Sequence, residues 1–272
     1  MKKRILSVLL CLCMVMALLP TTALAAGTGT APETIYICGM ALKNGDCLIN
    51  NGATSATDYT VGAPYVARYQ NGILYLNGLN KTYAGVANGY RALNWNYSNS
   101  GAHDLVIELV EGSVNTLVDT NYGAISGASG FGSDGPSLTI QGKGTLNVTG
   151  KSYAIWVWES VTIQNGATVH ANGGTQSGIS INDTSGAITV KQGTTVTTSG
   201  TYGISGSNGR TVNFNIEGGN LVVKGTTQAL YNTVASIDSA IDVYVSSVAN
   251  PTQESDVTTW NRSDDLVSSS FK

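Results

Sequence analysis

The sequence has little charge, few cysteines and no long apolar run after residue 25. Asp, Glu, Lys and Arg make up 11% of the 272 residues, against about 25% in an average soluble domain. A membrane helix would need roughly 20 consecutive apolar residues, so we expect none after residue 25. Basic residues are too sparse to favour nucleic acid or anionic membranes as partners. Gly, Thr, Ser, Asn, Val and Ile replace the missing charge. This composition predicts an all-β domain with tight turns.

The first 25 residues have three features in a fixed order. Lys2, Lys3 and Arg4 form a positive head, residues 5–19 are apolar, and Ala23-Leu24-Ala25 has the small residues of a cleavage site. This order is typical of a signal peptide, with a buried N-terminal helix as the alternative. We therefore predict a secreted, extracellular protein, free or associated with the cell wall. Cleavage leaves 11 basic and 17 acidic residues, a net charge of about −6.

Two of the four cysteines lie in the predicted signal peptide, which leaves Cys38 and Cys47. They flank Asn44-Gly45, a turn dipeptide that would fold residues 35–38 back on residues 47–49. Outside the cell the environment is oxidising, so we predict a disulfide between Cys38 and Cys47 across this hairpin. Two unpaired thiols are the alternative.

The middle of the chain repeats one motif. The copies are Thr139–Leu146, Thr162–Val169, Thr189–Val196 and a shorter Asn215–Leu221. Equivalent aliphatic residues in successive copies are 23, 27 and 26 positions apart. A period in this range, with apolar and polar residues alternating inside each copy, is typical of a solenoid of short strands. We predict a single-stranded parallel β-helix. An antiparallel sandwich is the alternative, but it gives no reason for the copies to stay in register.

Stacked coils would place equivalent side chains above one another at roughly 4.8 Å. The first expected internal ladder is Ile140, Ile163, Val190 and Ile216, and the second is Ile155, Ile179, Ile204 and Leu230. A glycine closes each copy, at Gly150, Gly173, Gly200 and Gly225. We predict an N-terminal β-hairpin cap over residues 26–100, coils over residues 101–247, and a C-terminal cap or tail over residues 248–272.

The sequence contains no cluster of residues suited to catalysis. Hydrolysis of a glycosidic bond needs two carboxylates at one place, and the only adjacent acids, Asp264 and Asp265, lie in the predicted tail. A calcium-dependent lyase needs an acidic cage and a base. His103 and His170 are single and far apart in the sequence. We therefore predict no catalytic residues and no enzymatic activity.

Two tryptophans are the strongest candidates for a binding site. If Ile155 and Val157 point inward, Trp156 and Trp158 point outward on one face. Flat aromatic rings stack on the apolar faces of sugars. The other predicted carbohydrate-binding residues are Ser180, Asn182, Asp183 and Tyr231. The alternative is that the tryptophans pack under a loop or the tail, against Trp260.

Calcium is the one cofactor that the sequence suggests. Asp119, Asp134 and Asp183 could supply oxygen ligands together with carbonyl groups of glycine-rich turns. Their spacing matches no calcium loop, and solvated turn carboxylates are the alternative.

The stretch Asp104–Thr120, the segment Ser137–Val148 and the Ala-Ile and Gly-Ile closures resemble a family of secreted bacterial β-helix carbohydrate-binding domains. The resemblance covers roughly residues 70–272 and implies a right-handed parallel β-helix that binds cellulose or acidic plant polysaccharides, with calcium on the helix. It also implies that the chain ends early. We predict non-catalytic polysaccharide binding by a monomer. A structural or adhesive surface protein is the first alternative and a polysaccharide lyase the second.

Overall fold

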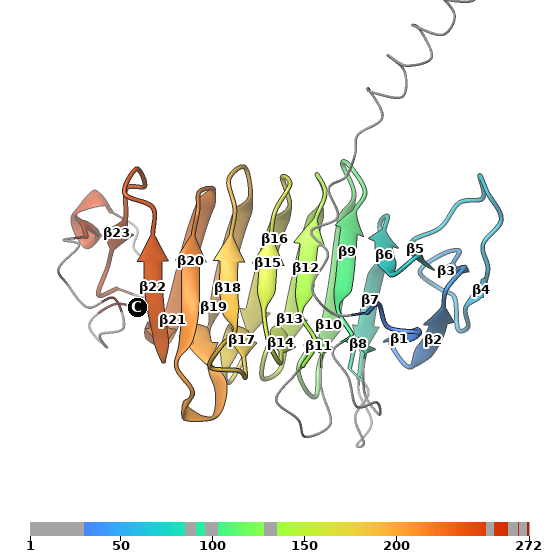
Figure 1. The fold of residues 1–272 in the computed structure, drawn as a ribbon, viewed down its shortest axis with the longest axis horizontal. Coiled ribbons are helices and arrows are strands. Elements are labelled where there is room, and N and C mark those ends of the chain that lie inside the picture. Colours follow the sequence, from blue (N-terminus) through green and yellow to red (C-terminus); the bar gives the residue numbers. More distant parts are fainter. Residues whose placement is uncertain are drawn as a thin grey trace, which may run out of the picture.

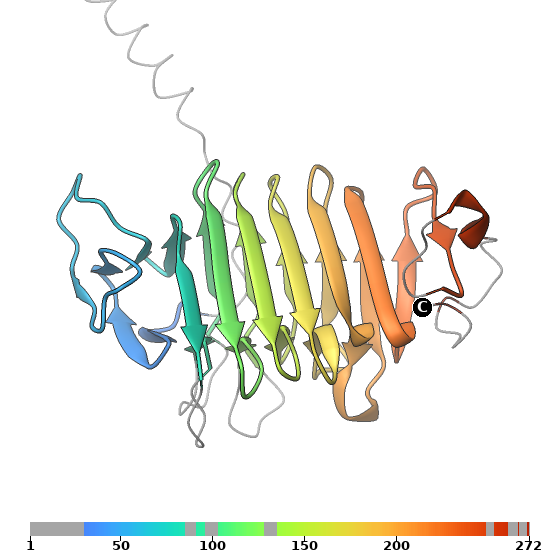
Figure 2. The same cartoon turned by 180° about the vertical axis from the view of Figure 1, so that it is seen from behind.

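The computed structural model describes residues 30–84, 91–95, 103–127, 135–248, 253–260, 266 and 271. Within these ranges the molecule is an elongated stack of strands, with β3 and β4 at one end and β22 and β23 at the other (Figure 1). The view from behind shows the same succession (Figure 2). The predicted all-β class is confirmed. The predicted signal peptide, Asp134 and Asp264-Asp265 lie outside the described residues.

Two curled sheets contain almost all of the strands. The ten-stranded sheet consists of β3 (Asp46–Leu48), β4 (Thr57–Asp58), β5 (Ala67–Gln70), β6 (Ile73–Leu76), β9 (Leu105–Leu109), β12 (Leu138–Gln141), β15 (Val161–Ile163), β18 (Ala187–Val190), β20 (Val212–Ile216) and β22 (Thr233–Ile237). The twelve-stranded sheet consists of β1 (Thr34–Ile37), β2 (Met40–Lys43), β7 (Asn80–Tyr83), β8 (Leu93–Trp95), β10 (Val114–Asp119), β11 (Ile125–Gly127), β13 (Thr145–Gly150), β14 (Ile155–Val157), β16 (Thr168–Gly173), β17 (Ser177–Ile181), β19 (Thr195–Gly206) and β21 (Asn220–Tyr231). A separate pair is β23 (Tyr244–Val245) with β24 (Thr258–Thr259), and the 3₁₀ turns are Ser207–Gly209 and Glu254–Asp256.

The sequence repeats pair with one another in parallel. In the ten-stranded sheet, Ile140 pairs with Ile163, Ile163 with Val190, and Val190 with Ile216. In the twelve-stranded sheet, Ile155, Ile179, Ile204 and Leu230 pair in the same succession. All eight side chains are buried in one hydrophobic core. Both predicted ladders are therefore present, because only this register keeps the aliphatic residues of every copy away from water.

The N-terminal end contains three antiparallel pairs of consecutive strands, β1–β2, β3–β4 and β5–β6. The turn at Asn71-Gly72 joins β5 to β6, and both residues have positive φ angles, 52° and 79°. The predicted hairpin around Asn44-Gly45 is wrong. The chain reverses earlier, at Cys38-Gly39, with φ angles of 49° and 80°, and pairs β1 with β2. Two positive φ angles are what a two-residue type I′ turn requires.

The early reversal places the two cysteines in different surroundings. Cys38 lies in the β1–β2 turn of the twelve-stranded sheet, whereas Cys47 is buried in β3 of the ten-stranded sheet beside β5. Both are free thiols, so the predicted disulfide is not formed. Burial raises the pKa of the Cys38 thiol to about 11, although nearby Lys81 lowers it in part.

The described residues contain no helix long and apolar enough to cross a membrane.

The thiols give a first prediction. Iodoacetamide at pH 8 should modify Cys38 in the folded protein about a hundredfold more slowly than in the unfolded chain, because only the thiolate reacts and a pKa near 11 leaves about a hundredfold less of it. Mass spectrometry after alkylation without reductant measures this. Two thiols that resist alkylation even after unfolding, in a chain 2 Da lighter, would instead show the disulfide.

Candidate functional site

The outward face of one run of strands carries a column of two serines with an aromatic side chain at each end. Trp156 on β14 pairs with Ser180 on β17, which pairs with Ser205 on β19. Ser205 in turn pairs with Tyr231 on β21. These strands come from four successive copies of the repeat, so the column is set by the same register that forms the internal ladder.

The serines in this column form a buried network. Ser180 Oγ donates to the Ser205 carbonyl at 3.1 Å, and Ser205 Oγ donates to Ser180 Oγ at 3.0 Å. The Ser177 and Ser205 hydroxyls are 2.7 Å apart. Ser207 Oγ lies 3.3 Å from Ser180 Oγ. Because the hydroxyls satisfy one another, these side chains can be buried at little cost.

Aromatic rings cover this network. Trp156 Nε1 donates to Ser207 Oγ at 3.0 Å. Since the serine lies beyond the intervening strand β17, the indole must extend across the sheet rather than stand away from it. Burial raises the pKa of Tyr153, and the nearby Ser207 side chain offsets part of this increase. The two rings are half-buried, so each keeps some surface open to solvent.

Two tyrosines continue the aromatic surface over the next coils. The rings of Tyr202 and Tyr231 are stacked, with centroids 4.3 Å apart and planes inclined by 12°. Both are half-buried. We call Tyr153, Trp156, Tyr202 and Tyr231 the aromatic strip. The sequence analysis missed Tyr153 and Tyr202, although both stand directly before an Ala-Ile or Gly-Ile closure, and that shared position was the available signal.

A family model with the description carbohydrate-binding domain-containing protein matches residues 98–269. The chain belongs to this family. The comparison with curated proteins gave no match, and neither did the comparison with solved structures. The whole aromatic strip lies inside the part of the chain that matches the carbohydrate-binding domain family.

Several residues that the sequence predicted for carbohydrate binding are buried. Ser180 is 0% exposed and Asn182 is 3% exposed. Asn182 Oδ1 accepts from Asn208 Nδ2 at 2.8 Å, and its carbonyl accepts from Arg210 Nη1. The prediction that Ser180 and Asn182 present free polar groups to a ligand is therefore wrong. The reason is steric, because large side chains on neighbouring coils lie over the small ones between them.

Trp158 differs from Trp156 in its surroundings. It follows the end of β14, and its ring packs so closely on Gly135 that a Cβ there would lie 2.0 Å from the indole Cδ1. The Arg210 guanidinium lies 5.6 Å from the ring centroid. The indole N–H is buried without a hydrogen-bond acceptor. Packing against a loop, the alternative considered for both tryptophans, therefore describes Trp158.

Asp119 and Asp183, two of the carboxylates predicted to bind calcium, accept hydrogen bonds from backbone N–H groups of their own turns. Asp119 Oδ1 accepts from the backbone N–H groups of Asn121 and Tyr122 at 2.9 and 2.8 Å. Asp183, at the end of a different strand, accepts from the N–H of Ser185 at 3.1 Å. Within the described ranges, no three His, Cys, Asp or Glu side chains gather around one point. The two described carboxylates belong to separate turns rather than to one cage.

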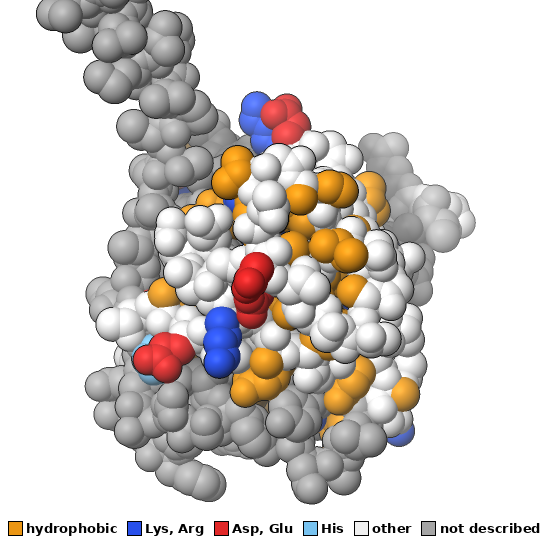
Figure 3. All heavy atoms as spheres, turned by 90° about the vertical axis from the view of Figure 1, so that its right-hand side faces the viewer, with side chains coloured by type: hydrophobic (Ala, Val, Ile, Leu, Met, Phe, Trp, Pro, Cys, Tyr) orange, Lys and Arg blue, Asp and Glu red, His pale blue; other side chains and the backbone are white. Residues whose placement is uncertain are grey.

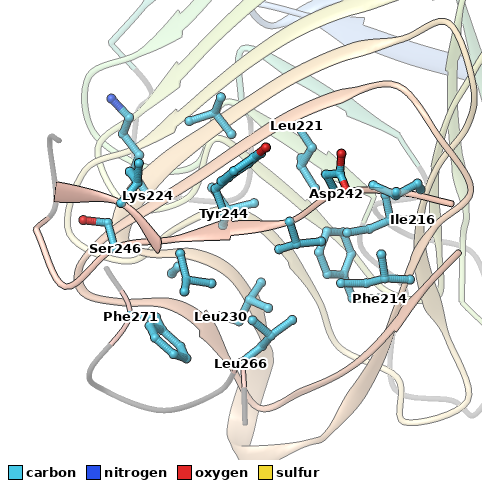
Figure 4. A pocket seen from close by; sticks show the side chains of 18 of the residues that line it. Phe214, Ile216, Leu221, Lys224, Leu230, Asp242, Tyr244, Ser246, Leu266 and Phe271 are labelled. Carbon is cyan, nitrogen blue, oxygen red and sulfur yellow. The ribbon is translucent and has the colours of Figure 1, made fainter. Parts of the chain in front are cut away.

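An apolar cavity of about 410 Å³ lies at the C-terminal end, where β23 and the chain around it cover the last coil. Figure 4 shows Phe214, Leu221, Leu230 and Leu266 around it, together with the ring of Tyr244. The cavity continues the hydrophobic core to its open end. Sugars need polar partners for their hydroxyls, and these walls offer few.

Proposed function

We propose that this protein is a secreted, non-catalytic polysaccharide-binding protein, and that the aromatic strip is its glycan platform. The observation that carries the proposal is the arrangement of four half-buried aromatic rings on and beside strands β14, β19 and β21, over serines that are already hydrogen-bonded. Rings held in this way lose little side-chain entropy when they bind a ligand. Membership in the carbohydrate-binding domain family supports the class of ligand.

The chemistry of the strip favours a neutral or mildly polar glycan. Its four members are uncharged, and the Trp156 indole N–H and the serine hydroxyls are already used inside the protein. Stacking of sugar rings on aromatic faces would then supply most of the contact, with tyrosine hydroxyls at the margins. Cellulose, which the sequence resemblance implies, is a neutral polysaccharide with such flat sugar faces.

The platform also depends on the architecture. We infer that the stacked repeats form a right-handed, single-stranded parallel β-helix, whose stacked coils bring the residues of the strip to one face. Parallel pairing at offsets of 23–27 residues supports this inference. We further propose that residues 1–25 direct secretion, since their pattern is that of a signal peptide.

A glycan array probed with the protein, with and without EDTA, would identify the polysaccharide and test for calcium. Affinity electrophoresis in gels that contain this polysaccharide would then compare two variants. Tyr231→Ala should weaken binding several-fold, because it removes one ring of the Tyr202–Tyr231 stack. Tyr231→Phe should bind as the wild type does, because it keeps the ring.

The two Tyr231 variants separate the loss of the ring from the loss of the hydroxyl. Equal mobility of Tyr231→Ala and wild type in every polysaccharide gel would contradict the role of this residue. Weak binding by Tyr231→Phe alone would mean that a hydrogen bond, rather than stacking, holds the glycan.

A further inference from the structure

The last coil of the stack lacks the apolar cover that the earlier coils have. Leu146, Val169 and Val196 share one inward column on β13, β16 and β19, and each is 0% exposed. Leu221 continues this column on β21 but is only half-buried. Each of the first three residues packs beneath the next coil, whereas β21 pairs with β19 alone among the described strands. An apolar space therefore remains beyond the last coil.

The C-terminal segment encloses this space from the other side. β23 pairs with β24, and the Phe271 carbonyl accepts from the N–H of Ala229 on β21 at 3.1 Å. These contacts hold the segment over the coil and leave the cavity of about 410 Å³ between two apolar walls. The coil contributes Leu221, Val223 and Leu230 to the walls, and the segment contributes Ile241, Val245 and Leu266.

The opposite end of the core is closed by packed side chains. There the two sheets continue into the antiparallel pairs β1–β2, β3–β4 and β5–β6, and Leu42, Leu48 and Leu76 are 0% exposed. Figure 3 looks onto this end and shows hydrophobic side chains interspersed with polar and charged ones over its described surface. The space at the C-terminal end is therefore not an unavoidable result of ending a stack of coils.

The cavity has charged groups on one side only. In Figure 4 the charged ends of Lys224 and Asp242 point to the same side, and Leu266 and Phe271 lie on the other. The two charges are opposite in sign, so together they favour neither an anion nor a cation. A ligand that matches this arrangement has an apolar body and one polar, uncharged end.

We propose that the cavity binds a small amphiphile with one aliphatic chain and a neutral polar end, such as a primary alcohol. The volume of about 410 Å³ falls in the range of ligand pockets, about 300–1,000 Å³. Apolar cavities stay dry, so an entering chain displaces no hydrogen-bonded water. The occupant is a small molecule rather than another protein chain, because the C-terminal segment already covers the space. The cavity is separate from the aromatic strip and does not depend on it.

Displacement of N-phenyl-1-naphthylamine, a neutral dye that fluoresces in apolar surroundings, tests the proposal. We expect 1-hexanol, 1-octanol and 1-decanol to displace the dye from the wild-type protein. Affinity should rise about tenfold for every two methylenes, because each added methylene is buried against the walls. Decanoate should bind more weakly than 1-decanol, since its negative charge would lie on the side that holds Asp242 as well as Lys224.

Three tryptophan variants show whether the cavity itself is the site. Val245→Trp fills it from β23 and should weaken 1-decanol binding about tenfold or more. Leu221→Trp fills the same space from the coil and should act in the same way. Val114→Trp is the matched control, because it adds the same ring at a residue that is 60% exposed on β10, and it should bind 1-decanol as the wild type does.

Circular dichroism checks that each variant is folded, and Leu221→Trp carries the test if Val245→Trp is not. The chain-length series needs only wild-type protein and stands even if both variants unfold. The proposal is overturned if 1-decanol does not displace the dye, if affinity is independent of chain length, or if a folded cavity-filling variant binds 1-decanol as tightly as the wild type. Tighter binding of decanoate than of 1-decanol would contradict a neutral ligand.

Discussion

Replacing Gly173 by alanine should destabilise the protein by about 3 kcal/mol or more. A Cβ atom at this position would lie 1.9 Å from the carbonyl oxygen of Ser177 and 2.9 Å from that of Ser152. Both obstacles are backbone atoms, so no side-chain rotation can relieve the clash. The change in the free energy of unfolding can be measured by urea denaturation followed by circular dichroism.

Gly193→Ala is the matched control. Gly193 has a φ of 81° and nothing within 4 Å of the added Cβ. The substitution should therefore destabilise the protein only through its left-handed backbone conformation, by about 1–2 kcal/mol. If Gly173→Ala lowers the free energy of unfolding no more than Gly193→Ala does, Gly173 does not approach the Ser177 and Ser152 carbonyl groups as closely as the structure shows. The same clash exists at Gly150 and Gly225, where the added Cβ would lie 1.8 and 1.7 Å from a carbonyl oxygen. This is why a glycine recurs at the end of the copies.

Replacing Trp156 by alanine should weaken polysaccharide binding about tenfold or more, because it removes the largest ring of the aromatic strip. The change also removes the hydrogen bond to Ser207 and uncovers the serine network. We expect an accompanying loss of stability of about 1–3 kcal/mol. Affinity must therefore be measured at a temperature where the variant is fully folded.

Two further substitutions show whether the ring itself is responsible. Trp156→Phe keeps an aromatic face but cannot donate to Ser207, so it should lose stability and retain most of the affinity. Tyr244→Ala removes an aromatic side chain that is 64% exposed on β23, away from the strip, and should bind normally. Equal weakening by Tyr244→Ala and Trp156→Ala would mean that binding does not depend on the strip.

The repeats made the core predictable. Spacings of 23–27 residues between equivalent aliphatic residues already determine which side chains stack, because a shift by one position would turn each ladder outward. The hairpin at Cys38-Gly39 was not predictable in the same way. A cysteine with positive φ is uncommon, and Asn44-Gly45 carried the stronger local turn signal.

The surface was harder to predict than the core. Alternation correctly indicated that Trp156 and Ser180 share an outward column, but an outward position is not always an exposed one. Ser180 is buried because the Trp156 indole reaches across it to Ser207. Such coverage depends on the length of side chains in neighbouring coils, which local sequence patterns do not encode. The packing of Arg68 against Tyr59 and Tyr65 also required the structure, since both tyrosines come from a loop.

The glycan platform is tested most directly by isothermal titration of the double variant Trp156→Ala, Tyr231→Ala with the polysaccharide that the array identifies. These substitutions remove one ring from each half of the strip. We predict no measurable binding by a variant whose circular dichroism spectrum matches that of the wild type. A folded double variant that binds the polysaccharide within twofold of the wild-type affinity would contradict the proposal.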